Sequence, residues 1–208
     1  MKTDVLCLLK NMDKHDAGLQ LALQCAPVIT GIKVSNLFII DKDKTGELYD
    51  IIEGTDISAY FLYEDNVKVN ILLYRKNELQ QYLLQKENQK FIRALGYNSV
   101  YIDELLPEFA IRFSLYQLTQ NEFPHEMGIL LGYPIEDVKG FIINSGKNEL
   151  YTGYWKVYEN LPEKLILFNY YEAAREHFIC LVAKGMDMNK ILMMYSRARK
   201  KYLQFQMN

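Results

Sequence analysis

Two β-rich runs that lie only three residues apart constrain the fold of this chain more than any other feature. Residues 59–63 and 67–74 are rich in aromatic and β-branched side chains, and Glu64, Asp65 and Asn66 lie between them. A connection of this length joins neighbouring strands in a hairpin. The fold is therefore expected to contain at least one antiparallel strand pair.

The rest of the pattern is mainly helical. Residues 36–41 predict a buried strand, and residues 150–158 alternate in a way that predicts another strand, able to join the hairpin sheet. Helices are predicted over residues 4–12, 16–24, 77–94, 101–118 and 163–184 and from Asp187 onwards, and two short helices begin at Pro124 and Pro134. The sequence thus predicts an α+β fold with a small mixed or antiparallel sheet of three to five strands, surrounded by helices, and a helical pair at the C-terminal end.

Two positions are expected to shape the first helices. Asp16 is a predicted N-cap, because its side chain can accept a hydrogen bond from the first turn. Pro27 disfavours helical geometry at Ala26, so the helix is expected to break or kink there. Cys25 is then predicted to lie at a junction between two helical segments.

Size and charge limit the function classes. The 208 residues suit a single domain, 1–208, with residues 163–206 as a helical extension. The net charge of -2 provides no field for attracting nucleic acid or an anionic membrane, so neither partner is expected. No apolar run is long enough to span a bilayer and no signal peptide is recognised, which predicts a cytoplasmic protein.

The three cysteines, Cys7, Cys25 and Cys180, are odd in number and widely spaced, which predicts reduced thiols. A helix that began at Pro27 would stabilise a thiolate at Cys25. The first functional hypothesis is therefore an enzyme with Cys25 as the nucleophile, His125 as the base and Glu126 orienting the imidazole. The alternative is that Cys25 is an ordinary buried small side chain.

His125 and Glu126 follow Pro124, which favours the first position of a helix. In the first turn the helix dipole favours an ionised Glu126 and a neutral imidazole, which is able to act as a base or a metal ligand. The alternative is that Glu126 caps the helix and His125 is a half-buried side chain with satisfied hydrogen bonds.

A metal site is not predicted. Ile129 stands where the HExxH motif of zinc proteases requires its second histidine. His177 and Cys180 lie three residues apart on a predicted helix, but an apolar face with this spacing is usually part of the core. The sequence identifies no cofactor.

The segment GYWKVY offers a second hypothesis. Tyr154, Lys156 and Tyr158 alternate with Trp155 and Val157, so one set is expected in the core and the other outside it. A cation between two phenols suits an anionic or aromatic ligand, and Arg75 at the end of the hairpin is expected to add a second cation. This pattern favours a non-catalytic ligand-binding or interaction protein, against the alternative of a solvated strand face.

Four blocks, residues 24–38, 70–75, 123–142 and 153–158, carry a resemblance to a known family. The chain resembles an uncharacterised bacterial family, a domain of unknown function seen mainly in anaerobic Gram-positive bacteria, whose members have HCAP, LVYR-like, FPHEIGLFLGYPLEDVEGFI-like and GYWKVY blocks. The resemblance covers about residues 21–158. It implies no activity, and Gln24 replaces the family's frequent histidine before the cysteine, which puts in doubt any scheme that needs a histidine beside the thiol. It singles out Cys25, Pro27, Arg75, His125, Glu126, Gly128, Gly132, Tyr133, Pro134, Trp155 and Lys156.

These observations favour a small-molecule-binding protein over a cysteine-dependent enzyme, because no catalytic signature is complete. A second alternative is a thiol protein linked to redox or iron handling. The ligand is expected to be anionic or aromatic, and a homo-oligomer is expected to form through the C-terminal helices. The predicted pocket joins Cys25, Arg75, His125 and Tyr133 with the strand residues Tyr154, Trp155 and Lys156.

Overall fold

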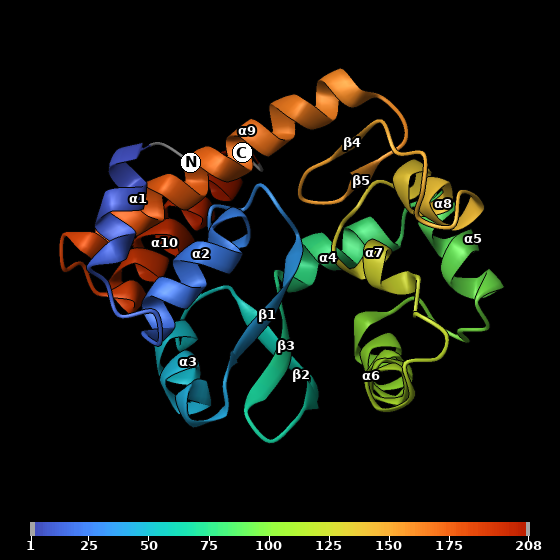
Figure 1. Ribbon diagram of the computed structural model, residues 1–208, viewed down its shortest axis with the longest axis horizontal. Helices are drawn as coiled ribbons and strands as arrows, with labels where there is room; N and C mark the ends of the chain where they lie inside the picture. The colour runs from blue at the N-terminus through green and yellow to red at the C-terminus, as the bar shows by residue number, and fades with distance from the viewer. Residues whose placement is uncertain (1–2, 207–208) are drawn as a thin grey trace.

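An antiparallel sheet lies in the middle of the molecule (Figure 1). The computed structural model describes the backbone of residues 3–206 and the side chains of residues 3–199 and 201. The strand order is β1-β3-β2, with β3 pairing on both of its edges. The predicted hairpin and the predicted strand at residues 36–41 are confirmed. The strands are β1 (Ser35–Asp41), β2 (Ser58–Glu64) and β3 (Lys68–Tyr74).

The hairpin connection falls one residue later than predicted, at residues 65–67. Asp65 fixes this position, because its Oδ1 atom accepts hydrogen bonds from the backbone N–H groups of Val67 and Lys68, both at 2.7 Å. An aspartate that binds its own following backbone stabilises a tight turn locally.

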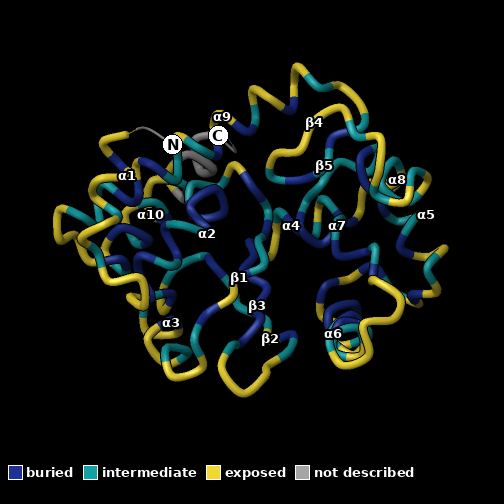
Figure 2. The backbone as a smooth tube through the Cα atoms, viewed as in Figure 1, coloured by how far each residue is buried: buried dark blue, intermediate teal, exposed yellow. Residues whose placement is uncertain are grey.

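The sheet separates two hydrophobic cores. Successive side chains of a strand point to opposite faces, so Phe38 and Ile71 enter one core while Leu37 and Leu72 enter the other. Figure 2 shows buried residues along α2 and the central strand β3, with exposed residues at the outer turns. The first core is covered by α1 (Thr3–Lys10), α2 (Ala17–Ile29), the 3-10 turn η1 (Lys42–Lys44) with α3 (Thr45–Ile52), α9 (Leu161–Ala183) and α10 (Met188–Gln206).

The second core lies under a separate group of helices, and a small two-stranded sheet flanks it. The elements on this side of the sheet are α4 (Lys76–Leu83), α5 (Lys86–Ala94), α6 (Ile102–Thr119), α7 (Glu126–Leu130), α8 (Ile135–Ile143), β4 (Tyr151–Thr152) and β5 (Lys156–Val157). The α+β prediction is confirmed. No helix within residues 3–206 is long and apolar enough to cross a membrane.

The predicted break at Pro27 is wrong. Helix α2 runs through Pro27 to Ile29, and the Asp16 side chain caps its start by accepting a hydrogen bond from the Leu19 N–H at 2.7 Å, as predicted. Proline removes one backbone hydrogen bond from a helix. Here α2 is buried between the sheet and α9, and this packing outweighs the local preference.

Two other elements differ from the sequence prediction. Residues 77–94 form two helices, α4 and α5, because the side chain of Asn88 donates to the carbonyl of Tyr82 at 2.8 Å and ends the first one. Residues 150–158 form a hairpin of their own, β4–β5, and do not join the central sheet. The Gly153 N–H donates to the Trp155 carbonyl at 3.0 Å across this reversal.

Two glycines without side chains let α7, α8 and the end of β5 pack closely. A Cβ atom at Gly140 would lie 2.5 Å from Tyr158 Cβ, and one at Gly128 would lie 2.7 Å from a methyl group of Val138. Gly132 has φ +70, the left-handed conformation that lets the chain turn after α7. Helix α7 begins at Glu126, two residues later than predicted, with His125 at its N-cap position.

Arg75 caps the C-terminal end of α2. Its Nε donates to the Val28 carbonyl at 2.8 Å and its Nη2 donates to the Ile29 carbonyl at 2.7 Å. Its Nη1 donates to the carboxylate of Asp56, and the side chain is only 2% exposed. The guanidinium therefore satisfies two terminal helix carbonyls and one charge at once. The role of Arg75 differs from the prediction. Its guanidinium binds groups within the fold, so Arg75 is not the second cation expected beside Lys156.

Replacing Arg75 should test this role. Arg75→Met leaves two buried carbonyls and the Asp56 carboxylate without their partner, so we expect the free energy of unfolding to fall by about 3–5 kcal/mol. Arg75→Lys keeps the charge but not the three-way geometry and should be intermediate. Urea denaturation measures both.

The neighbouring Lys76 provides the matched control, because its ammonium is exposed and pairs with the exposed Asp103. Lys76→Met should leave the urea midpoint close to that of the parent protein. Equal midpoints for the Arg75→Met and Lys76→Met variants would show that Arg75 does not stabilise α2.

Candidate functional site

A cleft of about 650 Å³ opens between the central sheet and the helices of the second core. Its floor comes from one face of β1 and β3, and its walls come from α6, α7, α8 and the β4–β5 hairpin. Most of the lining is apolar or aromatic, which is typical of small-molecule sites. The lining residues are Leu37, Ile39, Asp65, Lys68, Asn70, Phe113, Tyr116, Gln117, Phe123, His125, Met127, Gly128, Leu131, Tyr133, Asp137, Val138, Phe141, Tyr154, Trp155 and Lys156.

The His125 ring lies among aromatic rings at one wall. Its centroid is 5.7 Å from that of Phe123 and 6.0 Å from that of Phe141, both in edge arrangements. The side chain is half-buried, and none of the described residues forms a hydrogen bond or an ion pair with its ring. The imidazole thus reaches the cleft with both nitrogens available, which differs from the alternative of a satisfied histidine.

Tyr133 and Trp155 form a second aromatic wall. Their rings stack with centroids 4.9 Å apart, and the edge of Phe168 meets Trp155 at 4.6 Å. Tyr154 lines the cleft beside them. The predicted pattern in this segment is confirmed for its core face, since Trp155 and Val157 are buried. Four of the predicted site residues, Tyr133, Tyr154, Trp155 and Lys156, therefore line one cleft together with His125.

Asp137 positions this wall. Its carboxylate accepts hydrogen bonds from the Trp155 indole N–H at 2.7 Å and from the backbone N–H of Tyr158 at 2.7 Å. The side chain is 2% exposed, so these bonds are strengthened by their surroundings. Sequence reasoning missed Asp137, because an acidic residue in the first turn of a helix is normally explained by the helix dipole.

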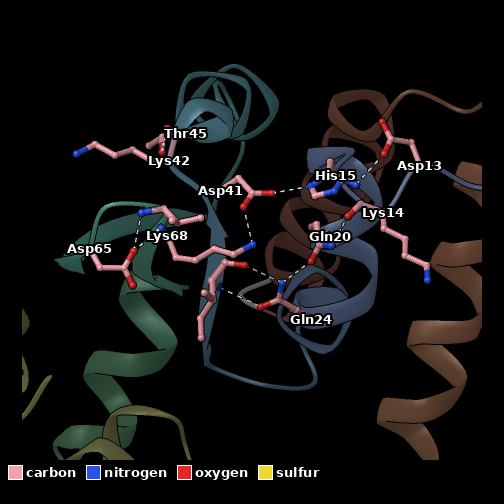
Figure 3. Close-up of polar contacts among 12 residues, drawn as sticks. Asp13, Lys14, His15, Gln20, Gln24, Asp41, Lys42, Thr45, Asp65 and Lys68 are labelled. Carbon is pink, nitrogen blue, oxygen red and sulfur yellow. Dashed lines mark hydrogen bonds and ion pairs between the residues drawn. The ribbon is translucent and has the colours of Figure 1, made fainter. Parts of the chain in front are cut away.

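The cations of the cleft are already paired. Lys68 Nζ lies 2.6 Å from Asp41, and Asp41 also binds the His15 ring at 2.9 Å, as Figure 3 shows. These two side chains, Lys68 first, hold the pKa of Asp41 below its usual range. The other lining lysine, Lys156, donates from Nζ to the Gly146 carbonyl at 2.6 Å and pairs with Glu149 at 3.0 Å. The cation predicted between two phenols is thus neutralised by its neighbours.

Asn70 is the polar residue of the cleft floor. It lies in the middle of the central strand and is only 8% exposed. Within the part of the chain whose side chains are described, nothing forms a hydrogen bond with its carboxamide. The signal in the sequence was an asparagine inside an otherwise apolar strand, where its propensity is low. The sequence analysis did not single it out.

Cys25 does not line this cleft. It lies inside α2, fully buried, so the predicted helix N-terminus does not act on its thiol. Burial raises the pKa of Cys25 to about 12, against smaller opposing effects of Lys33 and Asn36. The structure therefore does not bring Cys25 and His125 into one solvent-reachable site.

Lys33 lies beside Cys25 and is nearly as buried. Its Nζ donates to Asn36 Oδ1 at 2.5 Å and lies 5.3 Å from the centre of the Tyr133 ring, so it supports the cleft wall from behind. Burial lowers the pKa of Lys33 from 10.5 to about 8. No local sequence pattern indicates this burial, because burial of a lysine depends on the tertiary packing around it.

Glu126 does not take the catalytic role predicted for it. Its carboxylate accepts a hydrogen bond from the Tyr97 hydroxyl at 2.6 Å and lies 3.7 Å from the Arg112 guanidinium. Arg112 in turn lies 4.0 Å from the centre of the Tyr97 ring. Glu126 is buried, forms no capping hydrogen bond and serves this structural group, so the expected contact that would orient the imidazole is not formed.

One comparison with known proteins gives a result. A family described as "Protein of unknown function (DUF3793)" matches residues 21–192. The chain belongs to this family. The match extends beyond the blocks of the resemblance and covers all of α9 and the start of α10. No curated protein and no solved structure matches the chain.

Within the described residues of this DUF3793 protein, no group of three or more His, Cys, Asp or Glu side chains is arranged to hold a metal ion. His177 and Cys180 lie on α9, which packs along α2, and Cys180 contacts the first core. His177 is exposed, so the expectation that this spacing belongs to a packed helix face holds for Cys180 and is wrong for His177.

Two thiols of the DUF3793 protein should react differently with iodoacetamide. Cys7 is exposed and Cys25 is buried with a raised pKa, so native protein is expected to be alkylated at Cys7 and not at Cys25. Peptide mass spectrometry before and after unfolding in urea measures this. Native Cys25 that reacts as fast as Cys7 would restore the hypothesis of a reactive thiol.

Lys33 should make the stability of the protein depend on alkaline pH. Its charged form is disfavoured in the folded state, so its cost is full below pH 8 and disappears as the pH rises to 10.5. Lys33→Met is therefore expected to raise the free energy of unfolding by about 1–3 kcal/mol at neutral pH, with the gain shrinking as the pH approaches 10.

Urea denaturation between pH 7 and 10 follows this difference. The exposed Lys86 gives the matched control, since Lys86→Met should differ from the parent protein by the same small amount throughout. A Lys33→Met gain that does not vary with pH would contradict the lowered pKa of Lys33.

Proposed function

We propose that this DUF3793 protein binds a small, planar, aromatic molecule in the cleft between the central sheet and α7–α8. The observation that carries the proposal is the His125 imidazole, half-buried between Phe123 and Phe141 with no hydrogen-bond partner among the described residues. An aromatic ligand has the shape to stack against these rings, and the imidazole supplies a polar contact of defined direction.

The pairing of charges supports an aromatic ligand over an anionic one. Lys68 and Lys156, the cations that line the cleft, already bind Asp41 and Glu149. An anion would have to compete with these carboxylates for each ammonium group. Arg75, the other predicted cation, is occupied by α2 and Asp56. Of the two ligand classes expected from the sequence, anionic and aromatic, the geometry favours the aromatic one.

The two alternatives gain no support from the site. A cysteine-dependent enzyme needs its nucleophile and its base within direct or one-water contact, and Cys25 is buried outside the cleft that His125 lines. A thiol protein that handles redox equivalents or iron needs an accessible low-pKa thiol, whereas burial raises the pKa of Cys25.

Two expectations stay predictions. We place the protein in the cytoplasm on the strength of its unpaired cysteines. A homo-oligomer through the C-terminal helices is supported by exposed apolar side chains on α9, among them Ile166 and Tyr170. Part of α10 is used within the chain, because Ile191 and Leu192 are buried in the first core.

The single tryptophan gives a direct test of the proposed function. Trp155 is the only tryptophan of the chain and lines the cleft, so its indole N–H gives one identifiable signal in a 1H–15N NMR spectrum. Quinoline and isoquinoline, as neutral aromatic probes, should shift this signal saturably with dissociation constants below about 1 mM, a modest affinity for molecules of this size. Citrate, an anion without a ring, should leave it unchanged.

A pair of isoleucines provides the control. Ile39 lines the cleft and is 39% exposed, whereas Ile32 is similarly exposed at 42% but does not line it. Ile39→Arg should weaken probe binding at least tenfold by filling the opening, and Ile32→Arg should not. Saturation by citrate alone, or equal effects of the two variants, would overturn the proposal of an aromatic ligand in this cleft.

A further inference from the structure

The geometry points to Asn70 as the residue that selects the ligand: we propose that it binds a planar heterocycle with a hydrogen-bond donor next to an acceptor on one edge, as in a lactam. The inference rests on the proposed function, because it assigns the chemistry of the same cleft. It adds a polar residue that neither the sequence motifs nor the family resemblance identified.

Asn70 is fixed in place by the backbone of three strands. It lies on the central strand β3, directly between Ile39 of β1 and Tyr63 of β2. Its backbone is therefore held by the sheet, and its side chain lines the cleft. Val69 and Ile71, its neighbours in sequence, point to the opposite face and fill the first core. A polar group on so rigid a support has a well-defined direction.

The carboxamide has unmet hydrogen-bonding capacity. It provides one acceptor oxygen and two N–H donors, and within the described residues no side chain or backbone group pairs with any of them. A second asparagine shows the contrast: Asn36 donates to the Gln24 carbonyl at 2.8 Å and accepts from Lys33. Asn36 is used by the fold, whereas Asn70 is directed at the cleft.

Asn70 is only 8% exposed, so its unpaired amide reaches the cleft but loses most of the surrounding water, which is unfavourable for stability. Apolar side chains surround this part of the sheet: Leu37 and Ile39 lie on the neighbouring strand and Leu72 lies two residues along β3. Leucine would fit such a surface at lower cost. Residues that reduce stability without an internal partner are typical of binding sites.

The chemistry of a carboxamide defines its complement. Donor and acceptor lie side by side, and the same group recognises adenine by pairing with adjacent acceptor and donor atoms on one edge. A lactam offers the same alternation, and a flat ring that carries it can also stack against the aromatic walls formed by His125 and Trp155. Because Lys68 and Lys156 are paired, the preferred heterocycle is neutral.

Isoquinolin-1(2H)-one and isoquinoline form a matched pair of probes, since they share their shape and only the first has a lactam edge. Calorimetric titration of the parent protein should show about tenfold tighter binding of the lactam, the value of a buried hydrogen-bonded pair. Asn70→Leu should reduce the preference to less than twofold while isoquinoline still binds. The same variant should unfold about 2–4 °C above the parent protein in the absence of ligand.

Asn70→Asp keeps the shape of the side chain but replaces its donors with acceptors. It should bind the lactam more weakly than the parent protein does and should bind 1-aminoisoquinoline, a cation with adjacent donors, about tenfold more tightly, because its carboxylate accepts both bonds. This variant keeps the test open if leucine alters the packing of the sheet.

The outcomes separate the two proposals. Binding of both probes with the same lactam preference in Asn70→Leu, or a lower unfolding temperature for that variant, would overturn the role of Asn70 and leave the aromatic cleft in place. Failure of both probes to bind the parent protein would overturn the cleft itself and this inference with it. An Asn36→Leu variant, expected to lose stability, shows that the thermal assay distinguishes a structural asparagine from a ligand-directed one.

Discussion

The structure depends on β3 being paired on both edges and buried on both faces. Its seven residues, Lys68–Tyr74, hydrogen bond with β1 on one side and β2 on the other. A strand in this position has to supply apolar side chains in both directions, and β3 does so at every position but its ends and Asn70. Each of the two larger hydrophobic cores uses one face, so the two groups of helices are placed relative to each other by this strand.

The ends of β3 extend its influence. Arg75 follows directly and fixes the C-terminal end of α2, so this helix is held against the sheet by two hydrogen bonds of one side chain. At the other end Lys68 binds Asp41 at the edge of the cleft. The cleft lies where the second helix layer meets the same strand, and Asp137 completes it by fixing Trp155.

Much of the fold could be predicted from the residues. The hairpin, the strand at residues 36–41, the Asp16 cap and the aromatic core face of residues 155–157 all depend on local pattern, because a period of two or a capping side chain acts within a few residues. Pro27 and the β4–β5 hairpin were missed because their outcome depends on distant packing. A local preference of a few kcal/mol or less is overridden when the whole element is buried.

The candidate site divides in the same way. The sequence by itself determined which residue types were present: an aromatic segment at Tyr154 and Trp155, an imidazole beside Pro124, and a family to which these blocks belong. Only the tertiary structure decided which of them meet. It placed His125 and Trp155 on one cleft, gave Arg75 to a helix end and Glu126 to Tyr97, buried Cys25, and exposed the amide of Asn70 to the cleft. The physical reason is that charge pairing, desolvation and hydrogen-bond satisfaction depend on contacts between residues far apart in the chain, and local sequence pattern carries no record of those contacts.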